Sequence, residues 1–383
     1  MAIVYEGLVM AAAQAEKADP PVFHRVERLP QKLIIAPEMF RACGRPGDGN
    51  NINGPCLLRI PDPIPVERRA APQARYYLYF ADHGGRYIRL AWAEHVLGPY
   101  HLYQPGKGVL RLPGDRRLLE LNQTLAIGGH IASPEVWYEN GRFIMIFHGF
   151  ACQKQGQKWQ KKKKQRSFVA ESEFGLDFSR TIHPVDIADS YQRQFVYGGK
   201  RYLISMNAEQ QLPSDPTHPF DAPWKSVPVK YTLRTLLRDV AAQAQTWKDD
   251  PKNGPKSKVV FRHHAVAVHG HYLSWWFTLK HEAPERIYEA CVQLAPDWRR
   301  WKVIGLREVL RPEEPWEGST LPLKPSKGGP SHQPENALRD PAFFRDVDGQ
   351  EYLLYCVKGE RGIAIARLHH VPYHTPTESH ATE

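Results

Sequence analysis

The sequence predicts an all-β protein folded as a five-bladed β-propeller, with four antiparallel strands in each blade. Three observations predict this fold. Strand-like runs rich in aromatic and β-branched residues recur along the chain, most of them begin at a glycine turn, and their spacing is nearly regular. The marker residues Tyr76, Phe143, Tyr202, Tyr272 and Tyr352 follow one another at intervals of about 60 to 80 residues.

Each central run has further strand-like segments on both sides, so the repeating unit contains several strands. The central runs are 75–85, 141–150, 199–208, 270–282 and 349–360. The upstream strands are 54–60, 133–138, 193–197, 263–268 and 340–344. Third strands are expected at 87–94, 167–172, 286–294 and 362–368, and fourth strands at 98–103, 175–180 and 297–303. A β-sandwich with appendages explains many strands but not this repeated unit, whereas a closed propeller also removes exposed sheet edges.

The repeat sets the expected domain boundaries. We predict an N-terminal extension over residues 1–34, one propeller domain over 35–370 and a C-terminal tail over 371–383. The third unit matches least well, because long segments interrupt it after residue 208. The helix-compatible stretch 231–247 is expected to be a short helical insertion among loops in or beside this unit.

Composition narrows the class of protein. Hydrophobic residues make up 42% of the 383, which suffices for a packed core and excludes global disorder. The formal net charge of +10 favours acidic partners, or serves only solubility. Five cysteines without a CxxC pair argue against a disulfide framework or a zinc ribbon. We expect no membrane span and assign no signal peptide, which leaves a cytoplasmic or periplasmic location open.

In a propeller, the start of each innermost strand and the turn after each second strand lie on the same face. In this chain, those positions are rich in polar and ionisable residues. The carboxylates proposed as catalytic are Asp340, Asp82, Glu135 and Glu285. The residues proposed to bind substrate are Asn53, His83, His130, His148, Arg262, His263, Arg339 and Glu360.

The fourth and fifth units align closely, since "RHHAV" (262–266) matches "RDPAF" (339–343). Arg262 and Arg339 then occupy equivalent positions, where two guanidinium groups bind a carboxylate or sulfate in a bidentate fork. The alternative is a structural ion pair of Arg339 with Asp340 or Glu360. Because proline suits the first position of a strand, we expect Asp340 at the inner end of its strand, pointing into a cleft beside Arg339.

Other positions each allow two interpretations. The turn Asp82-His83-Gly84-Gly85 permits close approach of a ligand, or is only a tight turn. Glu135 stands among apolar residues, so it requires either a raised pKa or an arginine partner.

Basic and histidine-rich segments are the last features to place. The lysine-rich stretch 153–166 is expected in a loop between second and third strands, either as a solvated charge run or as a basic rim that attracts a polyanion. The segment 262–272 is dense in histidines, but strand alternation sends His263 and His264 to opposite faces, so they are no obvious chelating pair.

Three segments resemble a known group of enzymes. "YYLYFADHGGRYIRLAWAEHVLGPY", "HIASPEVWYENGRFIMIFHG" and "RDPAFFRDVDGQEYLLYCVKGERGIAIA" resemble the five-bladed β-propeller glycosidase superfamily of glycoside hydrolase families 43, 32 and 117, and its uncharacterised bacterial members, over roughly residues 35–370. The resemblance implies cleavage of glycosidic bonds by carboxylates at the channel mouth, with Asp340 stabilising an oxocarbenium-like transition state. Those enzymes carry an aspartate at the start of the first blade, where this chain has "NING" (51–54). Either Asp82 or a histidine substitutes for this aspartate, or the chain binds sugar without cutting it.

The expected function is therefore glycosidase activity on an oligo- or polysaccharide, an anionic one if the basic residues face the mouth. The alternatives are a non-catalytic carbohydrate-binding propeller and a basic propeller that binds nucleic acid or protein. The sequence contains no known nucleic-acid-binding motif, which makes that partner the least favoured. No cofactor is required by this chemistry, metal ligands are not assigned, and the resemblance permits a structural calcium in the channel.

Overall fold

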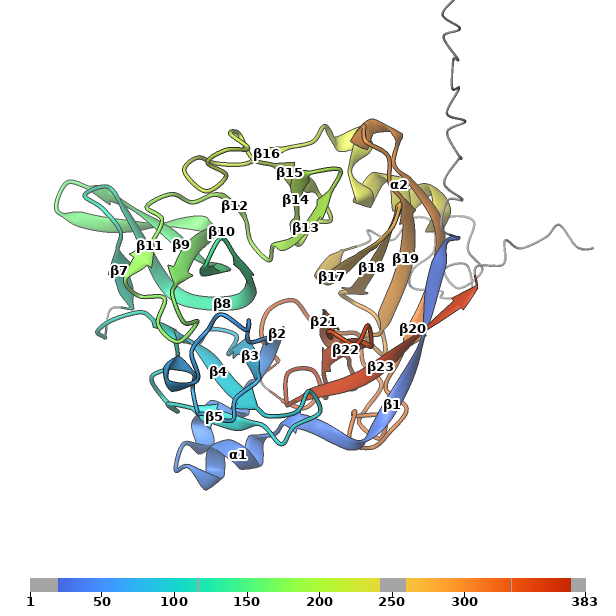
Figure 1. The fold of residues 1–383 in the computed structure, drawn as a ribbon, viewed down its shortest axis with the longest axis horizontal. Coiled ribbons are helices and arrows are strands. Elements are labelled where there is room, and N and C mark those ends of the chain that lie inside the picture. Colours follow the sequence, from blue (N-terminus) through green and yellow to red (C-terminus); the bar gives the residue numbers. More distant parts are fainter. Residues whose placement is uncertain (1–19, 116, 242–259, 332, 373–383) are drawn as a thin grey trace, which may run out of the picture.

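The computed structural model describes residues 20–115, 117–241, 260–331 and 333–372, and it shows five antiparallel sheets arranged around one axis (Figure 1). The predicted all-β, five-bladed propeller is confirmed. The sheets follow one another around the ring in chain order, so each predicted unit forms one blade.

The blades are numbered I to V in chain order. Blade I contains β2 (Asn53–Arg59), β3 (Tyr76–Ala81), β4 (Tyr87–Ala93) and β5 (His101–Tyr103), with β6 (Leu110–Arg111) paired to β4. Blade II contains β7 (Leu118–Glu120), β8 (Leu125–Glu139), β9 (Arg142–Gln155), β10 (Lys158–Ser172), β11 (Thr181–Ile182) and β12 (Ala188–Asp189). Blade III contains β13 (Arg193–Tyr197), β14 (Lys200–Ile204), β15 (Gln210–Leu212) and β16 (Lys225–Ser226).

Blade IV contains β17 (Phe261–His269), β18 (Tyr272–Leu279), β19 (Ile287–Gln293) and β20 (Lys302–Leu310). Blade V contains β21 (Arg339–Arg345), β22 (Glu351–Cys356), β23 (Ile363–Pro372) and β1 (Val22–Ile35). Helices are short: α1 (Pro37–Ala42), α2 (Leu233–Ala241), and the 3-10 turns η1 (Pro46–Asn50), η2 (Val66–Arg68), η3 (Val229–Tyr231) and η4 (Trp298–Arg300). No helix in the described part of the chain is long and apolar enough to cross a membrane.

The first described strand closes the ring. β1 pairs antiparallel with β23, so the outermost strand of blade V comes from the start of the chain. The expected boundary of the N-terminal extension, after residue 34, therefore falls inside a blade. Local repeats did not indicate this strand, because its partner lies more than 300 residues away and its own sequence mixes Arg, Glu and Pro with apolar residues.

Strand alternation explains the packing between blades. In β3, Tyr77 and Tyr79 pack into the cluster shared with blade II, whereas Leu78 and Phe80 pack into the cluster shared with blade V. All four side chains are fully buried. A strand buried on both faces reads as a continuous apolar run, which is the pattern that revealed the repeat.

The secondary structure of two segments differs from the expectation, and a third segment is described in part. The lysine-rich stretch is not a loop, because β9 and β10 continue through it as a hairpin in which Lys161 pairs with Cys152. The hydrogen-bond ladder holds these strands, and the Lys161 ammonium lies 4.2 Å from the centre of the Phe150 ring. The predicted fourth strand at 175–180 is replaced by β11 and β12, which are short. The predicted helix is present as α2, and residues 242–247 of that prediction lie outside the described residues.

Candidate active site at the channel mouth

In three blades, the innermost strand carries a left-handed residue that is followed by proline. Gly54, Ser133 and Asp340 have φ values of 60°, 50° and 49°, and a proline follows each of them. Each stands at a break in the register between the first and second strands of its blade. Glycine, serine and aspartate tolerate this conformation better than branched residues, and such a bulge redirects one side chain out of the ladder. The "RDP" motif is thus one instance of a repeated backbone feature.

These positions are linked from blade to blade by a series of contacts. A side chain on Gly54 would meet the Cα of Ser133 at 3.2 Å, and Ser133 hydrogen-bonds to Tyr191, whose own φ is 59°. The ring of Tyr191 lies 5.0 Å from that of His263, which in turn contacts Asp340. Each of the five blades therefore contributes one buried residue to this series of contacts.

A buried carboxylate joins blades IV and V. Glu285 is fully buried, and its two oxygens lie 2.9 Å from Nε of Arg262 and 2.9 Å from Nε of Arg339. Arg262 also donates to the backbone oxygens of Lys327 and Gly329. The sequence alignment placed the two arginines at equivalent positions, and in the structure both contact one carboxylate of the protein itself. Glu285 and both guanidinium groups are enclosed in this contact, which gives them a structural position beneath the mouth.

Glu360 extends this network to blade I. Its Oε1 lies 3.2 Å from Nδ1 of His83 and 3.6 Å from a terminal nitrogen of Arg339, and its Oε2 accepts hydrogen bonds from Asn51 and from the backbone of Ser331. Burial opposes ionisation, but these donors outweigh it and hold the pKa of Glu360 far below its usual range. Glu360 is therefore a permanent negative charge that positions His83.

Asp340 is buried at the start of β21. Its side chain is 2% exposed, and its Oδ1 lies 3.0 Å from Nε2 of His263, while its backbone N–H donates to Nδ1 of the same ring at 3.3 Å. Burial acts against the charged form, yet the imidazole holds the pKa of Asp340 below its ordinary value. Burial lowers the pKa of His263, so a neutral imidazole donates Nε2–H to the carboxylate. Arg339 contacts Glu285, Glu335 and Glu360, and the described contacts pair Asp340 with His263.

The wall formed by blade II carries two neutral histidines. Burial lowers the pKa of His130 to about 4, with smaller contributions from His83, Lys161 and Arg117. Burial also lowers the pKa of His148 well below its usual value, and neither of its ring nitrogens has a hydrogen-bond partner among the described residues. The rings of His130 and His148 lie 5.5 Å apart in an edge-on arrangement. Blade II thus contributes two uncharged, buried imidazoles, and the ring of His130 lies 6.5 Å from that of His83.

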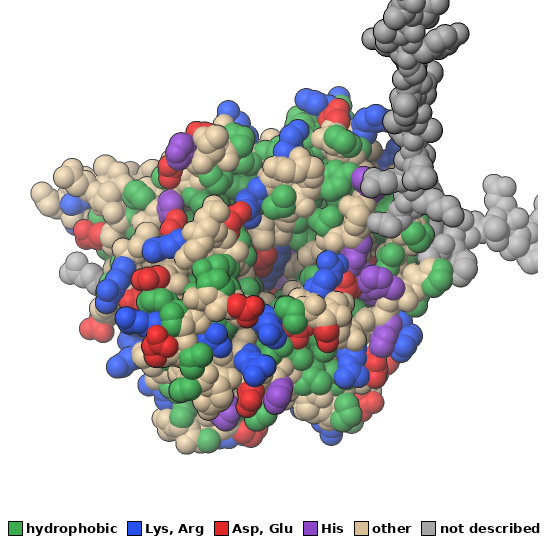
Figure 2. Space-filling model, viewed as in Figure 1, with side chains coloured by type: hydrophobic (Ala, Val, Ile, Leu, Met, Phe, Trp, Pro, Cys, Tyr) green, Lys and Arg blue, Asp and Glu red, His purple; other side chains and the backbone are tan. Residues whose placement is uncertain are grey.

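A cavity of about 620 Å³ opens beside the Asp82-His83 turn. Figure 2 shows the face of the propeller hollowed near its centre, with acidic and basic side chains around the hollow. The residues that line the cavity are Asn50, Asn51, Asp82, His83, Pro330, Ser331, Gln333, Pro334 and Arg361. Burial raises the pKa of Asp82, and the nearby carboxylates add to this effect, although Arg89 lies 3.1 Å from the carboxylate and opposes it. Asp82 is thus a solvent-facing carboxyl with an increased tendency to hold a proton.

The remaining predicted residues lie near this mouth but contact other groups. Glu135 faces Arg193, with 3.5 Å between its Oε2 and the arginine Nε, and burial raises its pKa. Asn53 is buried at the start of β2. His264 contacts the backbone oxygen of Met206 and the Trp275 indole, whereas His263 faces Asp340, so the predicted separation of these two histidines is confirmed.

Several residues of the site were not found in the sequence. Tyr191 lies in the third unit, where the repeat is weakest, and only its place just before β13 could have indicated it. Ser331 and Gln333 belong to an irregular segment between blades IV and V, for which no pattern gives a position. Glu335 precedes Arg339 by four residues, a spacing that is informative only in a helix.

Comparison with known proteins gives one related sequence and a set of solved structures. No protein-family model matches the chain. Uncharacterized protein R118 of Acanthamoeba polyphaga mimivirus is 28% identical over 356 residues, which covers 90% of each chain. The chain is similar in sequence to this viral protein along nearly its whole length.

Among solved structures, alpha-L-arabinofuranosidase from Lactobacillus brevis is 12% identical, with a TM-score of 0.49 over 83% of this chain and 90% of the other. A thermostable family-43 glycoside hydrolase is 14% identical, with a TM-score of 0.47 over 85% and 91%. A mutant of Cellvibrio cellulosa alpha-L-arabinanase is 10% identical, with a TM-score of 0.47 over 86% and 93%. One of these structures is a member of glycoside hydrolase family 43, which the sequence analysis also named. The fold assignment rests on the five sheets themselves.

The neutral state of His130 predicts a loss of stability in acid. The unfolded chain takes up a proton at this histidine below about pH 6.5, whereas the folded chain resists it down to about pH 4. Because the unfolded state binds more protons in this window, the free energy of unfolding falls as the pH falls. In His130→Gln, the decrease between pH 7 and pH 5 should be smaller than in the wild type by roughly 2 kcal/mol, measured by urea denaturation.

His95→Gln is the matched control, since His95 is exposed. It should leave the pH dependence unchanged. Equal pH dependence in the wild type and His130→Gln would show that His130 is not held neutral.

Proposed function

We propose that the protein binds a sugar chain in the cavity at the channel mouth and hydrolyses a glycosidic bond there. The observation that carries the proposal is the Asp82-His83 turn, which brings a carboxyl of raised pKa and an oriented imidazole to the wall of a cavity of about 620 Å³. Sugar rings are polar, and the cavity lining offers amide, hydroxyl and charged groups as hydrogen-bond partners.

In this proposal, Asp82 is the proton donor. Glycoside cleavage needs an acid that protonates the leaving oxygen, and a carboxyl in a partly desolvated position holds its proton closer to neutral pH. The side chain of Asp82 is 28% exposed, so it remains accessible to a substrate. Arg89 fixes its orientation through one carboxylate oxygen, Oδ2.

His83 is the proposed base that activates water. Its backbone N–H donates to Asn51 at 2.8 Å, and its Nδ1 contacts Oε1 of the buried Glu360 at 3.2 Å. A carboxylate at one ring nitrogen fixes the tautomer and the orientation of the ring, which leaves the other nitrogen for chemistry. Asp340 and Glu285 lie deeper, so we assign them to the electrostatics and structure of the mouth.

Binding without cleavage is the second candidate, favoured by the burial of the other proposed carboxylates. Glu285 lies between two arginines, Asp340 lies against His263, and Glu135 faces Arg193. Among the described residues that line the cavity, Asp82 is the single acidic one, whereas glycosidases ordinarily use a pair. Lys161 adds positive potential near His130 and supports an acidic sugar as the ligand in either case.

Replacing Asp82 tests the assigned acid. Asp82→Asn keeps the shape but cannot donate the same proton, so turnover of a glycan that the wild type cleaves should fall by about 10² to 10⁴-fold. Binding of that glycan, measured by calorimetry, should remain within a few-fold. The exposed Asp177, replaced by Asn, is the control that should keep full activity.

The measurement separates the two candidate functions. Saturable binding of glycans from a broad panel, without product release by the wild type, would support the binding protein and reject the hydrolase. Absence of both binding and cleavage across neutral and acidic glycans would contradict both candidates.

The preference for an acidic sugar is tested through the hairpin of β9 and β10. Lys161 contributes positive potential near His130, which indicates that this hairpin borders the mouth. We expect affinity for uronic or sulfated glycans to weaken as salt is raised, because screening acts on exposed charges. Lys161→Gln should bind such glycans more weakly and show a smaller salt dependence, while Lys302→Gln, at an exposed position of β20 in blade IV, should match the wild type. Equal affinity for neutral and acidic glycans at low salt would contradict the preference.

A further inference from the structure

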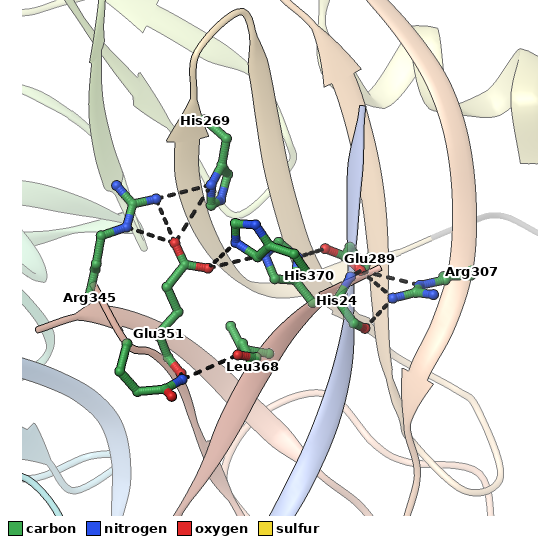
Figure 3. A network of polar contacts seen from close by, with 9 residues as sticks. His24, His269, Glu289, Arg307, Arg345, Glu351, Leu368 and His370 are labelled. Atoms are coloured by element: carbon green, nitrogen blue, oxygen red, sulfur yellow. Dashed lines mark hydrogen bonds and ion pairs between the residues drawn. The ribbon is translucent and has the colours of Figure 1, made fainter. Parts of the chain in front are cut away.

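Three histidines and a glutamate converge where the first and last strands of the propeller meet. His24 comes from β1, His269 from β17, Glu351 from β22 and His370 from β23. One ligand-type atom from each of them lies within 4.8 Å of all the others. Figure 3 shows the four side chains pointing toward one another, with Glu289 and Arg307 on one side and Arg345 on the other.

The cluster lies at the opposite end of blade V from the channel mouth. Arg339, at the mouth, pairs with Cys356, whereas Glu351 pairs with Arg345 at the far end of β21. His24 and His370 are directly opposite each other in the β1–β23 ladder. The cluster therefore joins the two strands that close the ring, and it also connects them to blade IV through His269.

Both ring nitrogens of His24 face carboxylates, and one of these nitrogens points into the cluster. Its Nδ1 lies 2.5 Å from Oε1 of Glu289, and its backbone N–H donates to Oε2 of the same carboxylate at 2.9 Å. Glu289 is fully buried and also contacts Arg307. Nε2 of His24 lies 3.2 Å from Oε2 of Glu351, and it can give up its proton to bind a metal ion while Nδ1 keeps its proton for Glu289. A carboxylate that orients a histidine in this way is typical of metal ligands.

The other two histidines approach the same carboxylate. Nε2 of His370 lies 2.9 Å from Oε2 of Glu351, and Nδ1 of His269 lies 3.6 Å from its Oε1. A guanidinium can only donate, so the 3.0 Å contact from Arg345 shows that Nδ1 of His269 presents a lone pair. Four atoms of the kind that bind metals thus lie within 4.8 Å of one another, where a metal ion or shared protons can link them.

We propose that His24, His269, His370 and Glu351 form a binding site for a divalent transition-metal ion of the zinc type. Three imidazoles and one carboxylate are donors that zinc accepts in a tetrahedral site, whereas calcium and magnesium prefer oxygen ligands. Tetrahedral zinc places its donors roughly 3.4 Å apart, so the cluster needs only a modest contraction. Bound there, the ion connects β1 to β23 and to blade IV, and it stabilises the closed ring.

Arg345 is the competing cation in this arrangement. It donates to Oε1 of Glu351 at 2.7 Å as well as to His269, so it occupies two of the atoms that the metal would use. Its side chain is 42% exposed and can move into solvent. Metal affinity should therefore increase when this arginine is removed, a result that a site with no metal function would not give.

The test is a titration of the full chain, treated with a chelator and then dialysed, with Zn²⁺ in a calorimeter. We expect one ion per chain, and a cobalt complex with the visible absorption of a tetrahedral site. His370→Gln, on a side chain that is 52% exposed, should weaken binding by at least about 10-fold, and His269→Gln should do the same. Zn²⁺ should raise the Tm of the wild type and not that of His370→Gln.

His369→Gln is the matched control, because the adjacent His369 contacts Glu27 and not the cluster. It should bind Zn²⁺ like the wild type, and Arg345→Met should bind it more tightly. The proposal is overturned if Zn²⁺ does not bind saturably, or if the wild type, His370→Gln and His369→Gln bind it with equal affinity. If Zn²⁺ does not bind saturably, the four side chains are held together by shared protons and by hydrogen bonds from Arg345 instead.

Discussion

The carboxylate of Glu285, buried between Arg262 and Arg339, is the interaction on which the arrangement of the channel mouth depends. It connects the first strands of blades IV and V at the points where their bulges begin. A buried charge without a partner destabilises the folded state, so removal of either arginine would leave the Glu285 carboxylate with less compensation for its burial. Through Arg339 the network continues to Glu360, and from there to Asn51 and His83 of blade I. The turn that carries Asp82 is therefore held by charges that lie beneath it.

The bulges and the charge network together determine how the innermost strands fit around the propeller axis. Five strands that meet around an axis bring backbone groups close together, and in three blades a left-handed residue beside a register break redirects the chain at this point. Gly54 is close enough to Ser133 that a side chain there would meet backbone at 3.2 Å, so blade I uses the smallest residue. Asp340 uses the same backbone conformation to reach His263. The proline after each of these residues fixes the start of the ladder.

The sequence was sufficient for the five repeating units and for some of the residues near the mouth, but not for their partners. Aromatic runs such as 75–85 are buried on both faces, so they stand out as strands without any knowledge of their neighbours. The equivalence of Arg262 and Arg339 follows from two short aligned segments, and the structure brings both to one point. That Glu285 lies between them depends on how blades IV and V pack, which no local pattern specifies. The same holds for β1: His24 and His370 become neighbours only when the ring closes. The lysine-rich stretch was misassigned as a loop because its charge concealed the pairing of β10 with β9.

The most direct test of this account is the free energy of unfolding of Glu285→Gln, measured by urea denaturation at neutral pH. Glutamine has the same size but leaves two buried guanidinium groups without their shared charge, so we expect a loss of about 3 to 5 kcal/mol. Glu38→Gln, which removes the exposed partner of Arg41, should change stability by less than about 1 kcal/mol. A loss in Glu285→Gln no larger than that in Glu38→Gln would contradict the view that this buried charge network holds the mouth of the propeller.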